Sequence, residues 1–167
     1  MDEFAHVRVA PEPLDAVEVL GRLSDATHGA QLLFVGVVRN DNLGRKVVAV
    51  SYDAFGPLAE RTLRDICLEA RTRWGEALRL EVAHRTGRLL VGEASVIVAV
   101  GSGHRSEAYE ASRYVLEQLK VRVPIWKKEH YESGDSEWLR GHELGAHGRV
   151  GIGGGPLDAN GTGQGEP

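Results

Sequence analysis

One stretch, residues 101–129 (GSGHRSEAYEASRYVLEQLKVRVPIWKKE), constrains the fold more than any other part of the chain. It follows a strongly apolar strand, Val96–Val100, and passes through a Ser/Gly turn into an amphipathic helix that we expect from about residue 103 to residue 121. Pro124 ends the helix, because the residue before a proline is pushed out of the helical region. A strand joined to such a helix predicts that the helix packs on a sheet through its apolar face, which carries Ala108, Ser112, Val115 and Leu119.

The same stretch concentrates positive charge at both ends of the helix. His104 and Arg105 stand at its start, beside free backbone N–H groups and the positive end of the helix dipole, where an anion would be favoured. Lys120 lies at the border of the apolar face, so its stem can pack while its amine reaches a cleft. If residues 125–131 are extended, Lys127 and Lys128 face opposite sides of the strand, and only one can enter a shared pocket. This pattern predicts a pocket for an anionic ligand.

The remaining elements predict an α+β fold. We expect short strands near residues 4–9, 30–39, 47–52, 80–84 and 94–100, with the run at 30–39 apolar enough to be buried on both faces. A first helix should follow Pro13, with Leu14, Val17 and Leu20 on its apolar side, and a second should follow Pro57. This order favours a mixed or antiparallel sheet with two long packed helices, an α/β hammerhead-like arrangement.

The composition changes at residue 141. Ten of the last 27 residues are glycine, which predicts a Gly-rich, disordered tail over residues 141–167 after a folded domain over residues 1–140.

Charge and cysteine content narrow the function classes. The net charge of −4 argues against bulk nucleic-acid binding, and no apolar run approaches the roughly 18 residues of a membrane span. The start, MDEFAHVRVA, lacks a secretory pattern, so we expect a cytoplasmic protein. Cys67 is the single cysteine, which excludes an intrachain disulfide and a cysteine-based metal cluster. Its place on the apolar side of the second helix predicts a small buried hydrophobic residue. We expect no metal and no cofactor.

Taken singly, these basic residues have ordinary explanations. Lys120 could be a solvated helix flank, Lys127 an exposed strand lysine weakly paired with Glu129, and Arg39 a surface residue of a polar turn. His84 on an expected strand reads as a satisfied, partly buried histidine, and no Ser/His/Asp order or metal-ligand spacing stands out.

Four motifs together resemble one family. FVGVVRNDNLG at residues 34–44 is similar to the F-x-G-x-V-R-x-x-N-x-G stretch of the large, catalytic subunit of molybdopterin synthase, the MoaE family. HRTGRLLVGE at residues 84–93, HR-x-x-A at residues 104–108 and LKVRVPIWKKE at residues 119–129 follow in the family's order, and Trp138 after Gly134 also matches. The resemblance covers about residues 5 to 140.

The resemblance implies a sulfurtransferase that uses no metal. It would convert cyclic pyranopterin monophosphate to molybdopterin by transferring two sulfurs from the thiocarboxylated C-terminal glycine of a small ubiquitin-like, MoaD-like sulfur-carrier subunit. It also implies a homodimer of large subunits within a heterotetramer, with active sites that borrow residues across the dimer interface.

The resemblance assigns site residues one by one. Lys120 and Lys127 match the two catalytic lysines. Substrate-pocket positions are matched by Arg39, by His104 and Arg105 from the opposite subunit, and by Phe34 and Arg140. Our hypothesis is that Lys120 transfers protons beside the glycyl end, while Lys127 stabilises negative charge on substrate and intermediate.

Two other functions remain open. A non-catalytic module could use the same pocket to bind a phosphorylated metabolite or an acidic peptide tail. A small RNA-binding domain is disfavoured, because only Trp126 and Tyr131 lie close enough to the basic residues to stack on bases.

Overall fold

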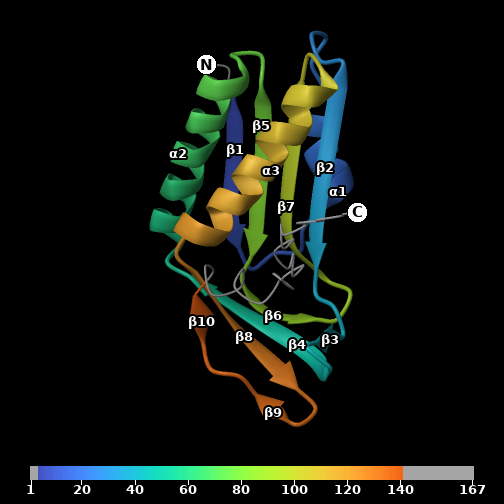
Figure 1. Cartoon of the computed structure of the whole chain (residues 1–167), viewed down its shortest axis with the longest axis vertical. Coiled ribbons are helices and arrows are strands. Elements are labelled where there is room, and N and C mark those ends of the chain that lie inside the picture. The colour runs from blue at the N-terminus through green and yellow to red at the C-terminus, as the bar shows by residue number, and fades with distance from the viewer. Residues whose placement is uncertain (1–3, 141–167) are drawn as a thin grey trace, which may run out of the picture.

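The structure, a computed structural model, describes residues 4–140 of the 167-residue chain. The glycine-rich segment at 141–167, expected to be a disordered tail, lies outside the described residues. Within the described part, two sheets are stacked end to end, and the two long helices lie against only one of them (Figure 1).

The first sheet has four strands in the order β1-β5-β7-β2. β1 pairs in parallel with β5, whereas β5 with β7 and β7 with β2 are antiparallel, so the sheet is mixed. β7 is buried along nearly its whole length, as its uninterrupted apolar sequence predicts for a central strand. The strand bounds are β1 Ala5–Ala10, β5 Arg79–Arg85, β7 Ala94–Ser102 and β2 Ala30–Val37.

Two long helices, α2 (Gly56–Trp74) and α3 (Arg105–Arg122), cover one face of this sheet, and the short α1 (Ala16–Arg22) covers the other (Figure 1). The main core forms between the long helices and the sheet. The apolar stripe of α2 is buried as predicted, and Cys67 is fully buried in it. Burial raises the pKa of the Cys67 thiol to about 12, so this residue behaves as a small hydrophobe.

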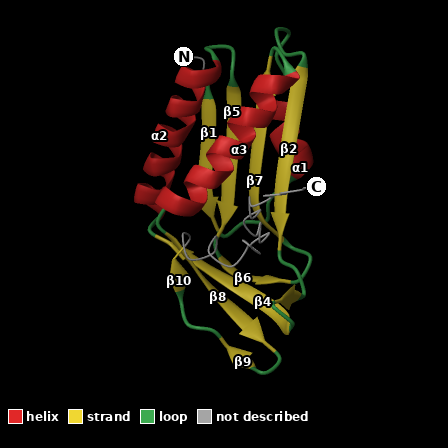
Figure 2. Cartoon of the chain, viewed as in Figure 1, coloured by secondary structure: helices red, strands yellow, loops and turns green. Residues whose placement is uncertain are grey.

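The second sheet has six strands and is drawn below the first in Figure 2. β8 is its centre, because it pairs antiparallel with β4, β9 and β10. A tight turn joins β3 to β4, with Leu43 and Gly44 both at positive φ. The bounds are β3 Asp41–Asn42, β4 Arg45–Ala54, β6 Gly87–Leu90, β8 Ile125–Tyr131, β9 Gly134–Asp135 and β10 Leu139–Arg140.

The predicted strand–helix–strand unit connects the two sheets. α3 begins after His104, whose backbone is extended, and its buried side includes Ala108, Val115 and Leu119. Val123 is already extended before Pro124, and the chain enters β8 of the second sheet two residues later. The C-terminal end of α3 and the beginning of β8 therefore meet where the two sheets join.

The α+β prediction, with a mixed sheet and two long helices, is confirmed. The burial predicted for residues 30–39 is wrong. β2 is an edge strand, and residues along it are half-buried or exposed, including Phe34 and Val37. An apolar run identifies a strand, but its place in the sheet depends on which strands pair with it.

None of the helices in residues 4–140 combines the length and the apolar character that crossing a membrane requires.

Candidate active site

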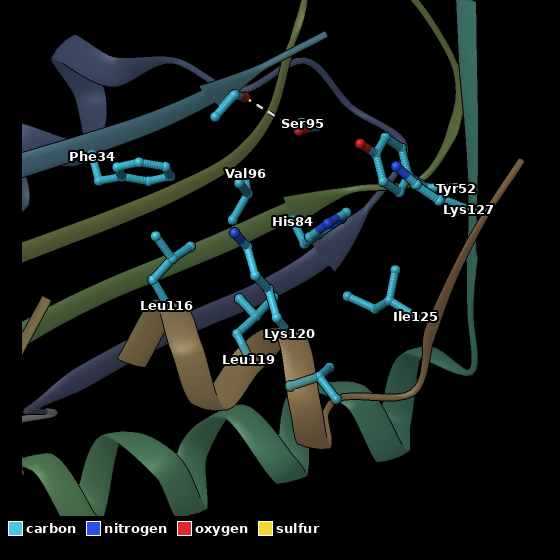
Figure 3. A pocket seen from close by; sticks show the side chains of 12 residues that line it. Phe34, Tyr52, His84, Ser95, Val96, Leu116, Leu119, Lys120, Ile125 and Lys127 are labelled. Carbon is cyan, nitrogen blue, oxygen red and sulfur yellow. Dashed lines mark hydrogen bonds between the residues drawn. The ribbon is translucent and has the colours of Figure 1, made fainter. Parts of the chain in front are cut away.

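A cavity of about 180 Å³ lies where α3 meets the junction of the two sheets (Figure 3). α3 supplies one wall, β2, β5 and β7 of the first sheet supply the floor, and β4 and β8 of the second sheet close the far side. Most lining side chains are apolar or aromatic, so a charged group inside would be poorly screened by water. The lining residues are Phe34, Gly36, Tyr52, His84, Ser95, Val96, Leu116, Leu119, Lys120, Val123, Ile125 and Lys127.

Both predicted catalytic lysines line this cavity. Lys120 comes from the last turn of α3 and Lys127 from β8, and Figure 3 shows the Lys120 amine directed across the cavity. Lys120 is exposed, which places it at the mouth, whereas the Lys127 side chain is only 20% exposed. Within residues 4–140, Lys120 forms no ion pair or hydrogen bond, so its amine is available to a ligand.

A second cavity of about 380 Å³ continues from the first. The two share Phe34, Tyr52, Lys120 and Lys127, and the second adds Arg39 from the turn after β2. The first cavity is mostly apolar, while the second contains charged and amide side chains. Together they form a groove that is apolar at one end and polar at the other.

Glu129 holds Lys127 in place beside the groove. Its carboxylate is nearly fully buried, accepts a hydrogen bond from Lys127 Nζ at 2.6 Å, and accepts further ones from Asn42 Nδ2 at 2.7 Å and from the Tyr131 hydroxyl. Burial alone would raise the pKa of Glu129, but these hydrogen bonds and the Lys127 charge outweigh it and lower the pKa. Arg39 joins the network by donating to Asn42 Oδ1 at 3.3 Å.

The alternation of β8 separates the two adjacent lysines, as predicted. Lys127 faces the groove, whereas Lys128 lies 3.4 Å from Asp135 on β9. Of the pair, Lys127 is therefore the one that can act in the groove.

His104 and Arg105 do not reach the groove of their own chain. They stand at the opposite end of α3 from Lys120, and 15 residues of helix correspond to roughly 22 Å. Both side chains are exposed, and with Gly29, Gly103 and Ser106 they line a separate cavity of about 460 Å³. The remaining predicted site residue is Arg140. Its backbone pairs with Trp126 in β10, but its side chain lies outside the part of the chain that the structure describes.

Three polar residues of the apolar cavity were not predicted as site residues: Tyr52, His84 and Ser95. Ser95 donates a hydrogen bond to the Gly36 carbonyl at 3.2 Å, and burial raises the pKa of the Tyr52 hydroxyl. His84 packs edge-to-face on Tyr52, with ring centres 4.9 Å apart. The HRTGRLLVGE motif contains His84, but strand alternation alone could not show that its side chain enters a cavity.

The structure also assembles a Ser–His–Asp arrangement that no sequence order indicated. Ser51 Oγ is 2.8 Å from His130 Nε2, and His130 Nδ1 is 2.9 Å from Asp135 Oδ1. Neither cavity of the groove includes these residues. Their contacts join β4, β8 and β9, which is a structural role.

Among residues 4–140, no three His, Cys, Asp or Glu side chains are grouped closely enough to hold a metal ion.

Comparison with known proteins identifies the family. The MoaE protein family profile matches residues 9–122. The chain belongs to the MoaE family. The predicted resemblance is thus confirmed, and the matched part includes β2, β4, α3 and Lys120.

Individual proteins are similar to this chain in sequence and in fold. The molybdopterin synthase catalytic subunit of Synechococcus elongatus is 48% identical over 136 residues, which make up 81% of this chain and 81% of that protein. The structure of molybdopterin synthase from Staphylococcus aureus superposes with a TM-score of 0.75 at 34% identity, and the match covers 79% of this chain and 95% of that one. A complex of subunits 1 and 2 of the molybdopterin-converting factor from Helicobacter pylori shares the fold, with a TM-score of 0.64 at 23% identity over 77% of this chain and 87% of that one.

Proposed function

We propose that this MoaE-family chain is the catalytic subunit of a molybdopterin synthase. It would convert cyclic pyranopterin monophosphate to molybdopterin by transferring two sulfurs from the thiocarboxylated C-terminus of a small ubiquitin-like carrier subunit. The observation that carries the proposal is the pair Lys120 and Lys127, which come from different elements and line one cavity.

The charge of the groove suits this chemistry. The substrate carries a phosphate and the thiocarboxylate is itself an anion, so both gain from the cations of Lys120, Lys127 and Arg39 around the polar cavity. The apolar walls of the inner cavity strengthen these interactions by excluding water.

Each sulfur transfer needs two kinds of assistance. Attack of the carrier's sulfur on a side-chain carbon of the pterin forms a C–S bond while that carbon loses its oxygen substituent as water or as a phosphate oxygen, and the carrier is then joined to the pterin through a thioester-like acyl group. Water hydrolyses the acyl–sulfur bond, which releases the carrier as a carboxylate and leaves the sulfur on the pterin. Lys127, held by Glu129, is placed to stabilise negative charge on the substrate and the intermediate. Lys120, which forms no ion pair within residues 4–140, is placed to transfer protons at the cavity mouth.

The groove gains further cations if the protein is a dimer. His104 and Arg105 lie too far along α3 to serve their own groove, and both are exposed for contact with another chain. We assign them to the groove of a second copy, as the family resemblance implies.

The carrier is a separate chain in this proposal. The Synechococcus relative is named a catalytic subunit, which implies at least one further subunit. We place the complex in the cytoplasm, since one buried, unpaired thiol suits a reducing compartment.

A reconstituted reaction tests the proposal. Purified protein is mixed with a thiocarboxylated small carrier and cyclic pyranopterin monophosphate, and dithiolene formation is measured. We expect product that depends on the thiocarboxylate, with the carboxylate form of the carrier as the control. Binding of both partners without product would instead favour a non-catalytic module for a phosphorylated metabolite or an acidic tail.

A further inference from the structure

His84 is a buried polar residue of the inner cavity that the roles above leave unused. The residue is only 5% exposed, yet its side chain lines the cavity together with both lysines. Figure 3 shows its ring between Lys120 on one side and Tyr52 on the other. Buried polar atoms are usually hydrogen-bonded, so both ring nitrogens of this imidazole are expected to have partners.

One ring nitrogen is committed to the backbone. His84 Nδ1 lies 2.9 Å from the Arg85 carbonyl oxygen, which can only accept, so Nδ1 carries the proton. Burial lowers the pKa of His84 to about 4, despite the opposing effect of this hydrogen bond, so the ring is neutral at pH 7. Nε2 is therefore an unprotonated acceptor.

The other nitrogen, Nε2, has no hydrogen-bond partner within residues 4–140. The edge-to-face contact with Tyr52, with ring centres 4.9 Å apart, restrains the ring. The Ser95 hydroxyl donates to the Gly36 carbonyl, and the hydroxyl oxygens of Tyr52 and Ser95 can also accept hydrogen bonds. Among the side chains lining the inner cavity, His84 Nε2 is an acceptor on a fixed, buried ring that carries no proton at that atom.

A peptide C-terminus has the complementary groups. Its last carboxylate or thiocarboxylate is an anion, which suits the two lysines, and the amide one bond back has an N–H that must find an acceptor once it leaves water. Gly36 and Val96 are packed closely in the cavity wall, and the cavity of about 180 Å³ has room for a slender chain end rather than for a bulky side chain.

We propose that His84 Nε2 accepts a hydrogen bond from the last amide N–H of the incoming carrier chain, and thereby makes the cavity specific for a peptide end. This inference rests on the proposed function, because it takes the carrier's C-terminus as the occupant. It assigns His84 a direct contact with the substrate.

The test removes the amide N–H and the imidazole separately. The thiocarboxylated carrier is made by semisynthesis in two forms, one with the normal last amide and one with an ester at that bond, which lacks the N–H at almost the same size. Steady-state kinetics with wild-type protein should give a KM for the ester carrier that is roughly 5- to 100-fold higher, the range for an unpaired buried group.

Two substitutions of His84 are tested with the same two carriers. His84→Asn can still donate to the Arg85 carbonyl but does not reach the position of Nε2, so the amide carrier should bind as weakly as the ester carrier. His84→Gln places an amide oxygen near the position of Nε2, so the preference for the amide carrier should return.

The outcomes are distinct. Equal KM values for the amide and ester carriers with wild-type protein would overturn the inference, and this result needs no protein variant. A lower KM for the amide carrier that persists in His84→Asn would also overturn it. Loss of activity in His84→Asn with equal KM values for the two carriers in the wild type would also overturn the inference, because the role of His84 would then not involve the last amide of the carrier. No product from wild-type protein with either carrier would overturn the proposed function, and this inference with it.

Discussion

Lys127 Nζ lies 2.6 Å from Glu129 Oε1, two residues away on the same face of β8. The contact joins a half-buried cation to a nearly buried anion, whose remaining partners come from β3 and from β8 itself. Lys127 is therefore held at the groove by a network, rather than by side-chain flexibility alone. Removing the carboxylate should affect the lysine's position as well as the stability of the sheet.

Glu129→Gln tests this relationship. The substitution removes the charge while keeping the side chain's size, so it should lower stability by about 1–3 kcal/mol and turnover by up to ~100-fold, because Lys127 loses its anchor. Glu132→Gln is the matched control, since Glu132 pairs with Lys46 on the open surface. Denaturant unfolding and the dithiolene assay measure the two effects, and equal behaviour of both variants would contradict the network.

The adjacent lysines of β8 form a second matched pair. Lys127→Ala should reduce turnover by roughly 100- to 1,000-fold, the usual cost of removing a charge-stabilising donor. Lys128→Ala should retain activity within about two-fold, because Lys128 pairs with Asp135 away from the groove. Comparable losses in both variants would show that the face of the strand does not decide function.

Lys120→Ala tests the proton-transfer role. We expect kcat to fall by about 100-fold or more while dimer formation and carrier binding persist, because Lys120 makes no ion pair within the described residues. Kinetics measure kcat, and calorimetric titration with the carrier measures binding. Near-normal activity would refute the assignment of Lys120.

Gly36 is required by the close packing of β2 on β7. A Cβ at this position would stand 2.6 Å from Val96 Cγ1, so Gly36→Ala should cost about 1–3 kcal/mol and distort the cavity floor. Gly21→Ala, where a Cβ meets nothing within 4 Å in α1, should instead stabilise by about 0.5–1 kcal/mol. Thermal unfolding of the two variants should shift in opposite directions.

His84 makes stability depend on pH. Burial lowers its pKa from 6.5 to about 4 in the folded chain, so between these values the unfolded state binds the proton more readily. Stability should therefore fall as the pH is lowered from 6.5 to 4, by about 3 kcal/mol from this group. His84→Asn should flatten the profile over this window in urea unfolding, and an unchanged slope would contradict the buried, neutral state.

Several features followed from local sequence alone. The end of α3 before Pro124, the buried stripe of α2 with Cys67, and the opposite directions of Lys127 and Lys128 were predicted correctly. Each depends on backbone periodicity or on a residue's own steric limits, which neighbours in the chain determine.

Other features needed the folded chain. The first helix was predicted with Pro13 at an early position and Val17 on its apolar face, but it begins after Asp15, whose side chain caps it, and Val17 is 79% exposed. Val19 is buried instead, because the position of α1 against the sheet selects the buried face. The single mixed sheet expected from the strand order is also two sheets, and their junction creates the groove.

The sequence by itself determined the elements, their order, the family and the residue types available for chemistry. Only the tertiary structure decided which of those residues share a site: it brought Lys120 and Lys127 to one cavity, placed His84 of β5 in the same cavity, and kept His104 at the far end of α3. The physical reason is that periodicity and turn chemistry are local, whereas a cavity depends on contacts between residues far apart in the chain.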